Sequence, residues 1–114
     1  MNEILIIPVK GLPEVKKGDD LASMTFSLIN KSENEIKDND IFVITQKIVS
    51  KSEGMERDLD EYEFEDLIKS ETKQIIRKRG DLIIAKTKHG FICANAGIDK
   101  SNIEKNKALL LPED

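Results

Sequence analysis

The chain has 114 residues, a net charge of −4 and only 4% aromatic residues, so it fits a single domain, residues 1–114, with a mainly aliphatic core. Its acids and bases are interspersed, which argues against a general binder of nucleic acid. No apolar run approaches the ~20 residues of a membrane span, the start does not read as a signal peptide, and the single Cys93 cannot form an internal disulfide. We therefore expect a cytoplasmic protein that binds neither membranes nor nucleic acid.

The first part of the chain reads as strand, helix and strand. Residues 4–9 (ILIIPV) are an apolar run too short for a helix and bounded by Pro8, which predicts a strand. Asp19 or Asp20 can cap a helix that runs to about Asn30. After a polar loop, residues 41–49 (IFVITQKIV) predict a second strand whose apolar first half is covered on both faces.

The second part begins with the strongest helical pattern. Five apolar residues within 61–79 share one helical face: Phe64, Leu67, Ile68, Ile75 and Ile76. An acidic start and a basic end suit the helix dipole, and Gly80 ends the predicted helix. Residues 82–87 and 91–94 predict a β-hairpin, and residues 108–112 (ALLLP) a last strand. The sum is an α/β fold of about five short strands and two helices in a mixed sheet, which leaves one face for a second copy to cover.

Two polar loops suit an anion. The loop 8–20 joins a predicted strand to a predicted helix, and its glycine can turn backbone N–H groups toward a phosphate. A plain structural turn is the alternative. In the loop 45–54, Lys47 and Lys51 follow a predicted strand, where open α/β sheets bind ligands. Solvated surface lysines are the alternative there.

The stretch NAGIDKSN (95–102) follows the predicted hairpin with two amides and a carboxylate. Asp99 can bind Mg²⁺ or Mn²⁺, and Asn95 and Asn102 can hydrogen-bond a phosphate, a base or a sugar. In the alternative interpretation these side chains satisfy their own backbone in an Asx-type turn. One carboxylate alone is a poor metal site, so a second has to come from elsewhere. His89 reads as a solvated residue of the hairpin turn, and Cys93 as a small core residue.

Three stretches in series resemble one family. The three stretches are PVKGLPEVKKGDDLA, DIFVITQKIVSKSEG, and KHGFICANAGIDKSN with LLLPED. In matching order across most of the chain, they are similar to the coenzyme F-420-0:L-glutamate ligases (γ-glutamyl ligases). The resemblance implies a GTP-dependent, amide-forming ligase, typically a homodimer, that adds L-glutamate to coenzyme F-420-0 through an acyl phosphate. It also implies Mg²⁺ or Mn²⁺ at the triphosphate, with K⁺ as a further candidate.

The resemblance assigns roles to particular residues but singles out no catalytic residue. The positions that it implies for GTP are Lys10, Gly11, Leu12, Pro13, Gln46, Lys47, Lys51 and Asn102. Asp99 matches a metal-ligand aspartate. On this interpretation the three loops 8–20, 45–54 and 95–102 converge on one anion-binding pocket.

The chain also departs from the family pattern. Members are roughly twice as long and continue after LLLP into a second region, whose TDT-like acidic motif supplies further metal ligands. The part between SEG and the hairpin is also shorter here. We therefore expect the N-terminal part of such a ligase, not competent for catalysis alone and completed by dimerisation or by the C-terminal region. The alternatives are a standalone module that binds nucleotide or a partner without catalysis, and an unrelated small interaction domain.

Overall fold

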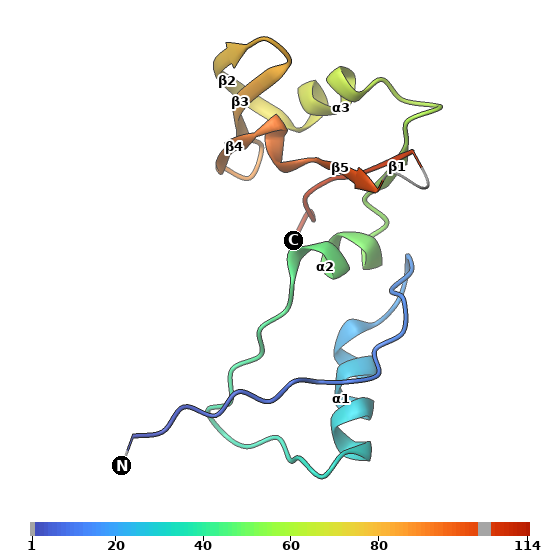
Figure 1. Cartoon of the computed structure of the whole chain (residues 1–114), viewed down its shortest axis with the longest axis vertical. Coiled ribbons are helices and arrows are strands. Elements are labelled where there is room, and N and C mark those ends of the chain that lie inside the picture. Colours follow the sequence, from blue (N-terminus) through green and yellow to red (C-terminus); the bar gives the residue numbers. More distant parts are fainter. Residues whose placement is uncertain (1, 103–105) are drawn as a thin grey trace.

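The computed structural model describes residues 2–102 and 106–114, and of Ser101 and Asn102 it describes the backbone alone. Three helices, one short 3₁₀ turn and six strands follow one another in this part of the chain (Figure 1). In order they are α1 Leu21–Lys31, α2 Gln46–Ser52, β1 Glu56–Asp58, α3 Phe64–Glu71, β2 Thr72–Arg79, β3 Leu82–Thr87, β4 Ile92–Ala94, η1 Asn95–Gly97, β5 Asp99–Asn102 and β6 Lys107–Leu109. The predicted α/β class is therefore confirmed.

The strands form two small sheets, where one mixed sheet was expected. One sheet has the order β2-β3-β4 and the other the order β1-β6-β5, and each pairing between described strands is antiparallel. The predicted hairpin 82–94 is confirmed, with Ala85 opposite Cys93. The predicted last strand is also present as β6, although it ends at Leu109. Residues 110–112 instead continue as an irregular segment.

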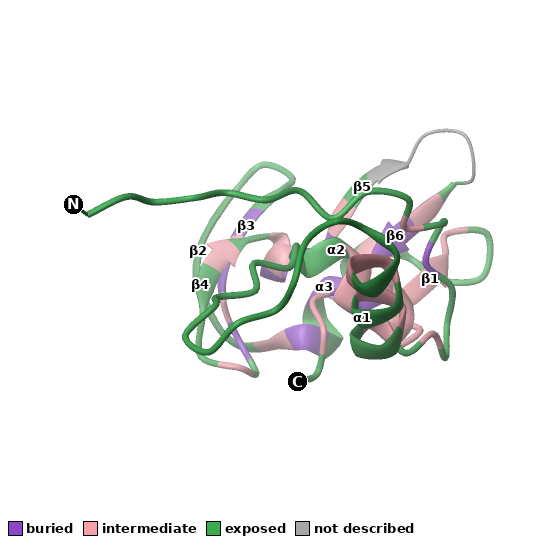
Figure 2. Ribbon diagram, turned by 90° about the horizontal axis from the view of Figure 1, so that it is seen from below, coloured by how far each residue is buried: buried purple, intermediate pink, exposed green. Residues whose placement is uncertain are grey.

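The core lies where the two sheets and α3 meet (Figure 2). Its buried members are mainly aliphatic, as the composition predicted: Met55, Leu67, Ile68, Ile83, Ala85, Ala96, Ile98, Ala108 and Leu110. Leu59 and Phe64 are partly buried and pack against this cluster. All of these residues belong to the part of the chain after α2. The core is therefore built by residues 55–110, without residues 2–45, which we call the N-terminal part.

Helix α1 forms where the sequence predicted it but buries none of its residues. Asp20 caps it, because its carboxylate accepts a hydrogen bond from the backbone N–H of Ser23, 3.0 Å away, and another from the Ser23 hydroxyl. This cap lowers the pKa of Asp20, through the backbone bond first and the hydroxyl bond second. Local capping thus defines α1 without help from a core.

The strands predicted for residues 4–9 and 41–49 are both wrong. Residues 4–9 and 41–45 are extended but belong to no sheet, and the predicted second strand turns into α2 at Gln46. A strand needs a neighbour for its N–H and C=O groups, and the described chain offers none to these segments. Gln46, Lys47 and Lys51 are good helix formers, and Thr45 is extended at the N-cap, so residues 46–52 form a helix.

The long predicted helix 61–79 is correct only in its first half. Helix α3 ends at Glu71, and the chain continues directly into β2, which pairs with β3 along residues 72–79. Ile75 and Ile76 fit the helical spacing, yet β-branched residues also suit a strand, and pairing with β3 decides the outcome. Gly80 therefore does not end a helix. With a φ of +59° it forms the hairpin turn between Arg79 and Leu82.

The molecule is elongated. Its principal extents are 50 × 34 × 21 Å and its radius of gyration is 17.5 Å, against about 13 Å for a compact domain of this size. Figure 1 shows the reason: the sheets and α3 lie together at one end, whereas α1 and the segments on either side of it extend away from them. Across the described residues, no helix has the length and apolarity that a membrane crossing requires.

Candidate functional site

Two of the three predicted loops meet beside the C-terminal end of α2. The backbone N–H of Gly18 donates a hydrogen bond to the carbonyl of Ser52, 2.8 Å away. Next to it the side chain of Lys17 crosses Gly54 so closely that a Cβ at Gly54 would lie 2.6 Å from Lys17 Cδ. Glycine is therefore required at position 54, where φ is also +73°. The loops 8–20 and 45–54 are thus held against each other by backbone contacts.

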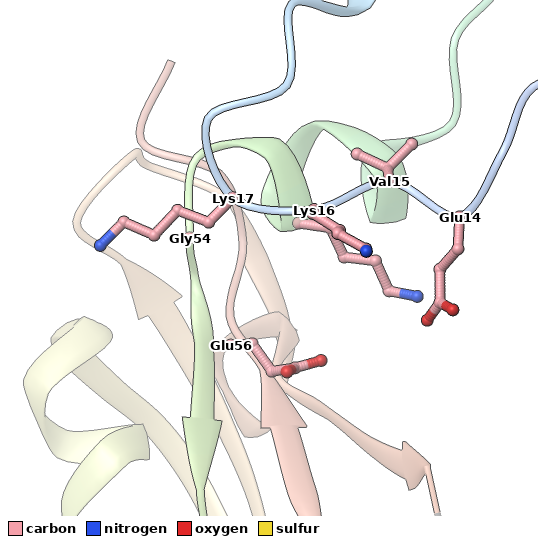
Figure 3. Close-up of a pocket in the computed structure, with 7 residues that line it drawn as sticks. Glu14, Val15, Lys16, Lys17, Gly54 and Glu56 are labelled. Atoms are coloured by element: carbon pink, nitrogen blue, oxygen red, sulfur yellow. The ribbon is translucent and has the colours of Figure 1, made fainter.

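A cavity of about 380 Å³ lies at this junction (Figure 3). Its lining carries three lysines and two carboxylates: Glu14, Val15, Lys16, Lys17, Lys51, Gly54 and Glu56. Figure 3 shows the side chains of Lys16 and Glu14 extending to the same side, whereas Lys17 runs past Gly54 in the other direction. Lys17 also lines a second, more open hollow of about 660 Å³ with Glu53 and Lys107. Lys16 comes from one loop and Lys51 from the other, so neither loop alone makes this site.

Glu56 links the cavity to the strands behind it. Its carboxylate accepts a hydrogen bond from Lys107 Nζ at 3.0 Å across the pairing of β1 with β6. This bond, with the attraction between the two charges, raises the pKa of Lys107. Since Lys107 stays protonated, it offsets the negative charge of Glu56 at the cavity wall.

The third loop reaches α2 through an ion pair. Lys47 Nζ lies 2.5 Å from Asp99 Oδ2, and the two side chains are 60% and 34% exposed. The residue predicted to contact nucleotide and the residue predicted to bind a metal are therefore brought together, but neither lines the cavity, so a single pocket shared by the three loops stays a prediction. An ion pair this exposed contributes about 0–1 kcal/mol, so a stronger ligand can displace it.

The described residues do not form a divalent-cation site by themselves. Among residues 2–102 and 106–114, no group of three or more His, Cys, Asp or Glu side chains could hold a metal ion. Asp99 faces an ammonium group where a cation such as Mg²⁺ needs further oxygen ligands. A divalent cation at Asp99 would therefore need ligands from outside the described residues.

Other predicted site residues lie away from the cavity or serve the fold. Lys10, Gly11, Leu12 and Pro13 are absent from the cavity lining, and Gly11 lies against α1, where a Cβ would be 3.5 Å from Leu28. Gln46 donates from Nε2 to the hydroxyl of the buried Ser50 at 2.7 Å. The side chain of Asn102 lies outside the described residues.

Asn95 serves the fold, as the turn interpretation proposed, but through β3. Its Oδ1 accepts a hydrogen bond from the backbone N–H of Ile83 at 3.2 Å. Asn95, Ala96 and Gly97 of η1 all have positive φ, and a Cβ at Gly97 would lie 2.6 Å from Leu111. This left-handed turn joins β4 of one sheet to β5 of the other, so it determines where Asp99 begins β5.

His89 was expected to be solvated, and that expectation is wrong. Both ring nitrogens are buried without a hydrogen-bond partner among the described residues, and the ring stacks on Phe91 with centroids 6.3 Å apart. The turn places the imidazole against Phe91, which a sequence pattern cannot show. Cys93 is half-buried on β4.

A carboxylate cluster that sequence reasoning missed fixes the end of the chain. Glu53 accepts hydrogen bonds from the backbone N–H groups of Glu113 at 2.6 Å and Asp114 at 3.4 Å. Lys88 Nζ lies 2.9 Å from the buried Glu71 and 3.8 Å from Glu113. These residues are far apart in the sequence, so no local spacing identifies them. Likewise Lys16 and Lys17 gave no signal beyond a pair of basic residues in a loop.

Comparison with known proteins gives one consistent family. The family model described as F420-0:Gamma-glutamyl ligase matches residues 11–114. The coenzyme F420:L-glutamate ligase of Methanothermobacter thermautotrophicus is 38% identical over 128 residues, which cover 97% of this chain and 51% of that protein. The protein of the same name from Archaeoglobus fulgidus is 33% identical over 126 residues, which cover 96% of this chain and 48% of its own length. The chain thus spans about half the length of these curated relatives.

Proposed function

This chain belongs to the F420-0:γ-glutamyl ligase family, and from that premise we propose that it supplies the nucleotide-binding part of a ligase that adds L-glutamate to coenzyme F-420-0. The proposed co-substrate is GTP. The observation that carries the proposal is the cavity of about 380 Å³ whose lining takes Lys16 from one loop and Lys51 from the other. A triphosphate is the substrate group of this reaction that most needs several ammonium groups close together.

The proposed reaction has two steps. The γ-phosphoryl group of GTP passes to the acceptor carboxylate of coenzyme F-420-0, which releases GDP and forms an acyl phosphate. The amine of L-glutamate then attacks the acyl carbon, the bond to phosphate breaks, and an amide and inorganic phosphate result. In both steps negative charge accumulates on phosphate oxygens, and fixed ammonium groups stabilise it. That stabilisation is the role proposed for Lys16 and Lys51.

Lys47 and Asp99 are proposed to separate when the substrates bind. They form an exposed pair, so Lys47 can turn to a phosphate at little cost. Mg²⁺ or Mn²⁺ is the cation proposed for the assembled enzyme, with K⁺ as a further candidate, and Asp99 is this chain's own contribution toward it. The assembled enzyme is proposed to be a cytoplasmic homodimer.

Thermal melting with nucleotides tests the binding site. GTP at about 100 times its Kd should stabilise the chain by about 2.7 kcal/mol, or roughly 10 °C in Tm, and ATP at the same concentration should stabilise it less. Lys51→Ala should remove most of the GTP effect because it deletes one ammonium group from the cavity. Lys73→Ala is the matched control, since this lysine is exposed on β2 far from the cavity lining. No shift with millimolar GTP would count against the proposed site.

A second function is favoured by the half-length match: a module that binds nucleotide without turnover. The described residues also lack a complete group of metal ligands, in keeping with such a role. An assay for glutamate ligation separates the two functions. Incubation with GTP, Mn²⁺, L-glutamate and coenzyme F-420-0 gives product only if the chain, alone or as a dimer, completes the site.

A further inference from the structure

Two apolar segments of the N-terminal part lie uncovered in solvent (Figure 2). They are residues 4–9, the first apolar segment, and residues 41–44, the second apolar segment. Ile4 and Ile6 are 93% and 85% exposed, and Ile41 and Val43 are 88% and 92% exposed. Leu5, which points to the opposite face of an extended chain from its neighbours, is 81% exposed as well. Both faces of the first segment are therefore bare at residues 4–6, whereas Ile7 and Val9 are 44% and 40% exposed.

The backbones of both segments are also unpaired. Within the described residues, no backbone hydrogen bond joins residues 4–9 or 41–44 to another part of the chain. Residues 4–7, which precede Pro8, and residues 41–44 are continuously apolar, as is typical of strands that are covered on both faces. Such segments need a sheet to pair with and apolar groups on each side. Only a folded polypeptide supplies both.

The end of the chain lies near the second apolar segment, which leads directly into α2 (Figure 1). Glu53, directly after α2, holds the backbone of Glu113 and Asp114. Figure 1 places the last residue beside α2, at the boundary between the folded sheets and the extended N-terminal part. A polypeptide that continued from Asp114 would therefore emerge beside the second apolar segment. In the two relatives compared above, about half of the protein lies outside the match.

We propose that the two apolar segments are docking strands for a polypeptide equivalent to the half of these ligases that this chain does not match. That polypeptide would add its own strands to residues 4–9 and 41–44 and cover their apolar side chains. We commit to this occupant over a second copy of the chain, because about half of each compared relative lies outside the match and the last residue lies beside α2. The proposal follows from family membership and exposure, and it holds whether or not GTP binds at the lysines.

Co-expression tests the docking directly. The full chain, with an affinity tag, is produced together with the unmatched half of the Methanothermobacter relative as a separate, untagged polypeptide, and in parallel with the corresponding half of the Archaeoglobus relative. We expect a one-to-one complex by sizing with light scattering. Hydrogen exchange of the amides of residues 4–9 and 41–44 should slow at least about tenfold relative to the chain alone, because they enter a sheet.

Charged substitutions provide matched controls. Val43→Asp should abolish the complex, because it places a carboxylate within the second apolar segment. Ile36→Asp introduces the same charge at an exposed residue of the loop 32–40, outside both segments, and should leave the complex intact. Both side chains are exposed in the chain alone, so neither variant should change the exchange of the core amides in α3 and β3.

Three results would overturn the proposal. The first is protection of both segments in the monomeric chain alone. The second is a homodimer whose formation protects those amides, which would assign the surface to a second copy. The third is failure of both partner halves to bind the wild-type chain. The GTP melting experiment is independent of all three, so a loss of one proposal leaves the other standing.

Discussion

The two parts of this molecule, residues 2–45 and 46–114, contain similar apolar sequences but differ in how they bury them. In residues 46–114, α3 and the strands around it enclose a core that includes Leu110, 1% exposed. In residues 2–45 only Val15 is buried among the described residues, although this part contains the runs ILII and IFVI. Apolar runs therefore say which residues need cover, and the presence of partners decides whether they receive it.

The largest difference between the two parts should be seen on deleting side chains. Leu110→Ala should reduce the free energy of unfolding by about 2–5 kcal/mol, because it leaves a cavity in the core. Leu5→Ala removes the same atoms from an exposed position and should change it by less than about 0.5 kcal/mol. Urea unfolding followed by circular dichroism measures both. Equal losses in the free energy of unfolding would show that the N-terminal part is packed in solution.

A smaller effect is expected at the ion pair between Lys88 and Glu71. Lys88→Ala leaves the buried Glu71 carboxylate without its cation and should cost about 1–3 kcal/mol. Lys69→Ala is the matched control, because its pair with Glu65 is exposed on both sides and is worth about 0.3–0.5 kcal/mol. Urea midpoints at neutral pH measure the two variants. A cost for Lys88→Ala no greater than for the control would mean that water reaches Glu71.

The smallest effect concerns α1, the element that forms without a core. Asp20→Ala should destabilise the helix by removing its cap. The pKa of Asp20 is lowered from 3.8 in the folded chain, so its contribution is complete above that value and is lost as the pH falls through the lowered pKa. Amide exchange in residues 21–31 should therefore accelerate on acidification in the wild type. In Asp20→Asn the same acidification should have little effect.

Sequence reasoning succeeded where local chemistry determines structure. The candidate caps Asp19 and Asp20 predicted α1, and two short apolar runs around a turn predicted the hairpin of β3 and β4. It failed where distant pairing decides. Residues 72–79 fit a helical face by spacing but pair with β3, and residues 41–45 read as a strand but have no neighbour. Periodicity describes a segment's own preference and contains no information about partners.

The candidate site was predictable to a similar degree. Lys47, Lys51 and Asp99 were selected from the sequence, and the structure brings Lys47 to Asp99 and Lys51 to the cavity. Lys16, Lys17 and Glu56 complete the cavity but show no pattern that separates them from ordinary surface charges. Their importance arises only from the contact between Gly18 and Ser52, which joins loops that are remote in the sequence.

The left-handed turn of Asn95, Ala96 and Gly97 affects residues beyond the turn itself. It joins the two sheets, and the strand that follows it starts with Asp99. Replacing Gly97 with any larger residue would both strain the backbone and displace Leu111, and so would move a charged group that the replacement never touches. A screen for variants that lose the proposed nucleotide binding is therefore expected to return Gly97 together with Lys16 and Lys51, although Gly97 has no side chain to contact a ligand.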